Sequence, residues 1–266
     1  MGDVTVNFIG FDMARDACLM VQRGAPLRAL VICLSFGLAG PALADTTAVY
    51  EHPAAKLKMT VEIATNGDVR GDIAGKPGVY FLTRNSQGYF VIQTSSGVLV
   101  DRVEDEGAAV KVVAEKRINP SFLAIMKSAG RDMAKIGPLL TKGDDIVIQG
   151  RKGTPYYFPG PRRPEIPPVI VMSSDPELAP LGVAMAHQFA MSDNLQLVGA
   201  PNPFNLEVET IMRGGAPIEF AGAELTTVSH DAIPPSRFEL PAAVESREDI
   251  VKRIDATATD QRVNAF

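Results

Sequence analysis

Short strand-like segments separated by turns dominate the chain from Lys56 to Val100. In the first, Lys58–Ile63, every second residue is apolar, and Asn66-Gly67-Asp68 then supplies a tight turn. A period of two places alternate side chains on opposite faces of a strand, so this segment predicts a β-strand with one solvent-facing side. Val69–Ile73 alternates again, and Val79–Leu82, Tyr89–Ile92 and Val98–Val100 follow as three more short strand-like segments separated by turns. Five consecutive short strands predict an antiparallel meander.

Two later segments change to the helical period. Asn119-Pro120 predicts a helix start, because Asn can cap a first turn and Pro suits the first helical position, and Gly137-Pro138 predicts its end. Asp175-Pro176 predicts the start of a second helix in the same way. The apolar residues expected to share one face are Phe122, Ile125, Met126, Ala129, Met133 and Ile136 in the first helix and Leu178, Leu181, Met185 and Phe189 in the second.

The remaining segments return to strand character, around a proline-rich stretch, Pro159–Pro168, that cannot join a central strand. The predicted strands are Asp145–Ile148, Thr154–Phe158, Val169–Met172, Leu206–Ile211, Ile218–Phe220 and Glu224–Ser229, with Gly214-Gly215 as a turn. We therefore expect an α+β fold built mainly on an antiparallel sheet, as one domain over residues 45–243. Residues 244–266 are predicted to form a charged tail that is partly helical or frayed.

The N-terminal part has the pattern of a secretory signal. Arg28 precedes the apolar run Ala29–Leu38, and Ala42-Leu43-Ala44 resembles a cleavage site before Asp45. The run is shorter than the roughly 20 residues that span a bilayer, so residues 1–44 are expected to be removed, with Met20 as a candidate start. This predicts a periplasmic protein. Both cysteines lie in the removed part, so we expect stability without disulfides.

Residues for catalysis, metal binding or nucleic-acid binding do not form a convincing pattern. The net charge of −5 speaks against a nucleic-acid partner, and three scattered histidines predict neither a metal site nor a cofactor. Ser229-His230-Asp231 has the residue types of a hydrolase, but neighbours on a strand point to opposite faces and cannot form a relay. Gly107 follows Glu104–Glu106 and Gly143 precedes Asp144-Asp145, so we expect these acidic residues to lie in solvated turns. We therefore expect no enzymatic activity.

The order of elements suggests a family. Together with the ending Leu225–Val228 and Ile233–Pro241, it resembles the periplasmic lipoprotein carrier superfamily, over about Lys56 to Ala243. The resemblance implies a half-open antiparallel barrel, a curved sheet covered by a helical lid, with an apolar hollow that accepts acyl chains. It also implies that Arg70, on the second strand, could tie the cover shut; an ordinary surface arginine is the alternative.

The resulting hypothesis is an exported, soluble and monomeric protein that holds a lipid or other apolar ligand between the curved sheet and two covering helices. The expected ligand-binding residues are Phe122, Ile125, Met126, Met133, Leu181, Met185, Phe189 and Arg70. If the helices pack tightly against the sheet, the apolar faces that carry these methionines form part of the protein core and line no cavity. The alternative is then a non-catalytic module with a solid interior that docks another envelope protein through a sheet edge and the loop Pro159–Pro168, where Arg162 and Arg163 lie.

Overall fold

The computed structural model describes residues 44–72, 75–122, 124, 125, 128, 138–160, 166–192 and 203–263. The predicted signal before Ala44, and the predicted site residues Met126 and Met133, lie outside them. So do Arg162 and Arg163 of the proline-rich loop. Among the helices that are described, not one combines the length and the apolar character needed to cross a bilayer.

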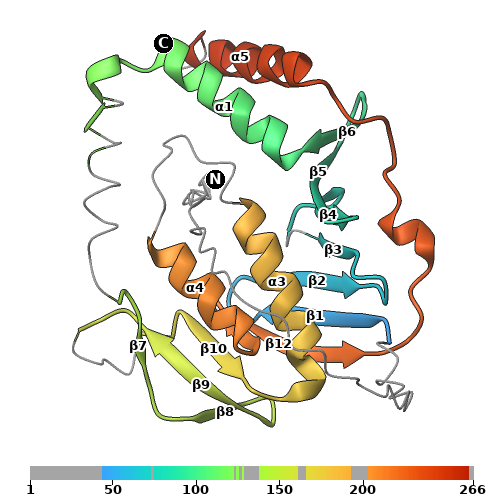
Figure 1. The fold of residues 1–266 in the computed structure, drawn as a ribbon, viewed down its shortest axis with the longest axis vertical. Helices are drawn as coiled ribbons and strands as arrows, with labels where there is room; N and C mark the ends of the chain where they lie inside the picture. Colours follow the sequence, from blue (N-terminus) through green and yellow to red (C-terminus); the bar gives the residue numbers. More distant parts are fainter. Residues whose placement is uncertain are drawn as a thin grey trace, which may run out of the picture.

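The described strands form one antiparallel sheet that curves without closing (Figure 1). They are β1 (Thr46–His52), β2 (Leu57–Ile63), β3 (Val69–Asp72), β4 (Val79–Arg84), β5 (Gln87–Thr94), β6 (Gly97–Arg102), β7 (Thr141–Lys142), β8 (Ile146–Ile148), β9 (Arg151–Tyr157), β10 (Ile170–Ser173), β11 (Ala216–Phe220) and β12 (Ala223–Ser229). The strand order is β6-β5-β4-β3-β2-β1-β12-β11-β10-β9-β7, and β8 pairs with β9. The predicted α+β class and meander are confirmed. The unpredicted β1 joins the meander to the later strands.

The helices include corrections to the prediction. They are α1 (Val103–Arg117), the 3₁₀ turn η1 (Pro176–Leu178), α3 (Ala179–Ser192), α4 (Pro203–Arg213), η3 (Pro235–Phe238) and α5 (Arg247–Val263). The predicted strand Leu206–Ile211 is wrong, because this segment belongs to α4. The acids Glu104–Glu106 do not lie in a turn but form the first turn of α1, where the helix dipole favours negative charge.

The predicted helix starts are confirmed where the structure describes them. Asn119 Oδ1 accepts a hydrogen bond from the backbone N–H of Ser121 at 2.8 Å, as an N-cap should, and helical residues follow from Pro120. Asp175 accepts from the Glu177 N–H at 3.0 Å and starts η1, which continues into α3. Local capping chemistry therefore fixes both starts.

The sheet has two covered faces. Helices α3 and α4 lie within its curve, on what we call the inner face, whereas the segment from β12 to α5 runs along the outer face (Figure 1). The inner core contains Val61, Ile218 and Leu225 from the sheet together with Leu181 and Met212 from the helices. The smaller outer core is centred on Tyr80, Leu82, Tyr89, Val91, Val100 and Phe238.

The C-terminal tail is an ordered helix in the described part of the chain. Asp255 of α5 pairs with Lys116 and Arg117 at the end of α1, at 2.7 Å and 2.5 Å. Ile250 is fully buried, so α5 is anchored by packing as well as by charge. Within the segment predicted as a charged tail, the structure thus has a helix over Arg247–Val263 that packs against α1.

Candidate functional site

Helix α3 is held tightly against the sheet and α4. Gly182 lies so close to the Gly215 carbonyl that an added Cβ would overlap it. Leu181 has no exposed surface and Met185 is 8% exposed. The Tyr50 hydroxyl lies 3.3 Å from Met185 Sδ and donates to the Pro217 carbonyl at 2.6 Å. At this end of α3, the predicted ligand-binding residues Leu181 and Met185 are therefore part of the packed core.

The other predicted ligand-binding residues are more exposed. Phe189, one turn beyond Met185, is half-buried and meets the Phe220 ring edge-on, with ring centroids 5.8 Å apart. On the helix that begins after Asn119, Phe122 is 55% exposed and Ile125 is 65% exposed. The structure thus gathers Leu181, Met185 and Phe189 on one helix, and does not place Phe122 or Ile125 in their cluster.

Arg70 has a role that sequence reasoning misplaced. Its neighbour Gly71 faces Gln188 of α3, so Arg70 points to the outer face. There its guanidinium lies 3.6 Å from the centre of the Tyr80 ring, bonds Asp72 at 3.0 Å, and donates to the Arg237 carbonyl at 3.4 Å. Its side chain is 15% exposed. Arg70 is therefore neither an ordinary surface arginine nor a tie to the helices, because it holds the C-terminal segment.

A continuous apolar patch lies on the inner face, beside the C-terminal end of α3, where Gln188 and Met191 approach Gly71 and Gly88. Residues that are paired directly across antiparallel strands share a face. Phe81 is paired with Gly71, which faces α3, and with Phe90, and the two Phe rings are 4.9 Å apart. The inner patch, as we call it, consists of the half-buried side chains Val79, Phe81, Phe90, Ile92 and Leu99. In the described structure these side chains belong to neither buried core.

Acidic groups border the inner patch where β6 meets α1. Asp101 is paired across the sheet with Phe90, so it lies on the inner face, and it is fully buried. One Asp101 oxygen binds Arg253 of α5, which also binds Glu245 at 3.1 Å. Burial raises the pKa of Asp101. Burial, and secondly the charge of Asp101, raises the pKa of Glu106 to about 7.

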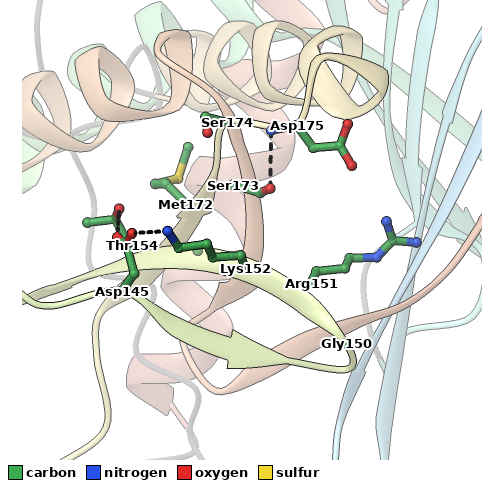
Figure 2. A pocket seen from close by; sticks show the side chains of 10 residues that line it. Asp145, Gly150, Arg151, Lys152, Thr154, Met172, Ser173, Ser174 and Asp175 are labelled. Atoms are coloured by element: carbon green, nitrogen blue, oxygen red, sulfur yellow. Dashed lines mark hydrogen bonds and ion pairs between the residues drawn. The ribbon is translucent and has the colours of Figure 1, made fainter.

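A polar cavity of about 450 Å³ lies elsewhere, between the β8–β9 turn and the loop before η1 (Figure 2). Lys152 binds Asp145 at 2.8 Å, and this contact lowers the pKa of Asp145. Ser173 accepts from the Asp175 N–H at 3.2 Å, and Arg151 points away from Lys152. Opposite charges and internal pairing leave this cavity without a clear preference for one ligand class.

The possible relay of Ser229, His230 and Asp231 does not form. Ser229 donates directly to Asp231 at 2.6 Å, whereas the His230 ring lies 3.3 Å from the Thr46 hydroxyl. In the part of the chain that the structure describes, no group of three or more His, Cys, Asp or Glu side chains has a geometry that could hold a metal ion.

The inner patch was missed at the level of sequence, although a signal for it exists. The segments Val79–Leu82, Tyr89–Ile92 and Val98–Val100 are apolar at every position rather than at every second one. Such continuous runs indicate strands whose two faces are both covered or occupied. The outer-facing residues pack under the C-terminal segment, so the inner-facing ones needed a separate explanation.

No family model, no curated protein and no solved structure matches this chain. The function is therefore inferred from the geometry of the structure.

Proposed function

We propose that this protein is an exported, non-catalytic binding protein that holds a lipid or other apolar molecule on the inner face of its sheet. The observation that carries the proposal is the inner patch. Its five apolar side chains are contiguous across β4, β5 and β6, yet remain half-buried outside both cores. A folded monomer gains by covering such a surface, and an apolar ligand would supply the cover.

The proposal includes a half-open barrel with two covering helices, α3 and the helix that begins after Asn119. The exposed Phe122 and Ile125 are the side chains that this second helix offers to an apolar partner. The element order shared with the periplasmic lipoprotein carriers supports the same shape. Export is part of the proposal, and it predicts that the protein isolated from the cell envelope begins at Asp45, which intact-mass measurement would test.

Binding of the uncharged fluorescent probe N-phenyl-1-naphthylamine tests the proposal. Ile92→Ser removes an apolar side chain from the inner patch, and Val183→Ser removes one that is 54% exposed on α3 as a matched control. Loss of about 50 Å² of apolar contact would cost ~1.3 kcal/mol, so the Ile92 variant should bind about tenfold more weakly. The control should bind like the wild type. Absence of probe binding by the wild type, or equal binding by the Ile92 variant, would refute the proposal.

A second candidate is the envelope interaction module with a solid interior. The tight packing of Leu181 and Met185 favours it. So do Phe158, which precedes the proline-rich loop, and Ile166, which lies within it, because these side chains are 61% and 52% exposed. This alternative predicts a cross-linked envelope complex that is lost in Phe158→Ser and retained in Ile92→Ser. The proposed ligand-binding function predicts no such dependence on Phe158.

A further inference from the structure

Buried polar atoms without partners gather at one border of the inner patch. In the described chain, several buried side-chain nitrogen or oxygen atoms have no hydrogen-bond partner. Four belong to residues beside the patch: Thr83 Oγ1, Gln188 Nε2, Asp101 Oδ1 and Glu106 Oε2. Thr83 is 2% exposed and Asp101 has no exposed surface. A buried polar atom without a partner destabilises the fold, so a ligand that supplies hydrogen bonds to these atoms would be favoured here.

Strand register places these atoms together. Asp101 is opposite Phe90, and Thr83 is opposite Gly88, so both lie on the inner face. A Cβ on Gly88 would touch Val103 at the start of α1, and Glu106 lies three residues later on the same side of that helix. Gln188 of α3 covers Gly71, which is opposite Phe81 in the neighbouring strand. The polar atoms therefore border the Phe81–Phe90 end of the patch.

The hydrogen-bond donors and acceptors at this border determine which kind of head group an amphiphilic ligand can place there. Ionised Asp101 and Glu106 offer only acceptors, Gln188 Nε2 is a donor, and the Thr83 hydroxyl can act as either. A hydroxyl group can donate to the carboxylates and accept from Gln188. A carboxylate head can only accept, and it would bring negative charge next to two acids. Arg253 does not reverse this balance, because it is already bound by Asp101 and Glu245.

We propose that the ligand of the inner patch is an amphiphile with an uncharged, hydroxyl-bearing head, such as a monoacylglycerol, and that Asp101 and Glu106 exclude free fatty acids. This inference rests on the proposed function, because the apolar chain of the amphiphile occupies the same patch.

Displacement of bound N-phenyl-1-naphthylamine by two amphiphiles of equal chain length tests the inference at pH 8. Monododecanoylglycerol and dodecanoate are each used below the concentration at which they form micelles. Dodecanoate should need at least a tenfold higher concentration to displace half of the probe. Glu106→Gln, which keeps the side-chain shape and removes the charge, should reduce that ratio at least threefold. Glu104→Gln, at an exposed position in the same first turn, should leave the ratio unchanged.

The outcomes separate the two proposals. A probe that does not bind the wild type refutes the proposed function and this inference with it. A probe that binds but is displaced equally well by both amphiphiles refutes only the inference. A ratio that is the same in Glu106→Gln as in the wild type also overturns it, because the discrimination would then come from the amphiphiles and not from the acidic border.

Discussion

Replacing Glu106 by Gln should stabilise the protein at alkaline pH and have much less effect at acidic pH. In the fold, burial and the nearby charge of Asp101 raise the pKa of Glu106 from 4.5 to about 7. In the unfolded chain the carboxyl group titrates near its ordinary value. Between these two values the folded state holds a proton that the unfolded state has released, so the free energy of unfolding falls as the pH rises.

The size of the effect follows from the shift. A difference of about 2.5 pKa units corresponds to ~3 kcal/mol, which is lost in full above pH 7 and retained in full below about pH 4.5. Removing the titrating group removes this loss. Any fixed cost of burying the Gln amide is the same at both pH values. The stability gained by the variant should therefore be about 2 to 3 kcal/mol larger at pH 8 than at pH 5.

Urea denaturation of the wild type, Glu106→Gln and Glu104→Gln at pH 5 and pH 8 measures this difference. The charged groups that act on Glu106 are Asp101 of β6 and Arg253 of α5, and Arg253 also binds Glu245. Because the pKa of Asp101 is also raised, the wild-type slope has more than one source, and only the comparison with the variant isolates Glu106. A Glu106→Gln effect that is equal at the two pH values would refute the reasoning, and so would an equal response of the exposed Glu104 variant.

Three further substitutions test the packing that positions the inner face. Tyr50→Phe leaves the buried Pro217 carbonyl without its donor, and should lower the free energy of unfolding by about 1–3 kcal/mol in urea denaturation; no change would contradict the 2.6 Å hydrogen bond. Gly182→Ala forces a Cβ into the Gly215 carbonyl, so circular dichroism should show a melting temperature well below that of the wild type, and an unchanged one would refute the close approach. Leu225→Ala empties a fully buried site, and calorimetry should show a loss of about 2–5 kcal/mol.

The parts of the fold that could be predicted from the sequence are those whose signals are local. The meander from β2 to β6 follows from alternation in β2 and β3, from short apolar runs in β4 to β6 and from the turn residues between them. The starts at Asn119 and Asp175 follow from capping side chains. In α4 a local signal was available but was misinterpreted. Leu206–Glu209 alternates over only four residues, whereas Phe204, Val208 and Ile211 repeat at the helical spacing after Pro203.

Helix α1 could have been predicted only from its charged residues, and strand β1 could not have been predicted from a local pattern. Helix α1 has little apolar contrast between its sides, but acids fill its first turn and Lys116 and Arg117 lie in its last, which is the order that a helix dipole favours. Strand β1 carries small and polar residues around Tyr50. Its place is fixed by pairing with β12, far along the chain, and a local pattern does not encode such a pairing.

The position of the candidate site was missed for a related reason. A period of two shows that a strand has two faces, but it does not show which distant segment covers each face. The resemblance implied that Arg70 could tie the helices shut, with a surface arginine as the alternative. Its side chain points to the other side of the sheet, where it holds the Arg237 segment. Once that segment covers the outer face, it accounts for Tyr80 and Val91 but not for Phe81 and Phe90. The apolar runs in β4 and β5 therefore require a second cover, and this requirement is the physical basis for placing a ligand on the inner face.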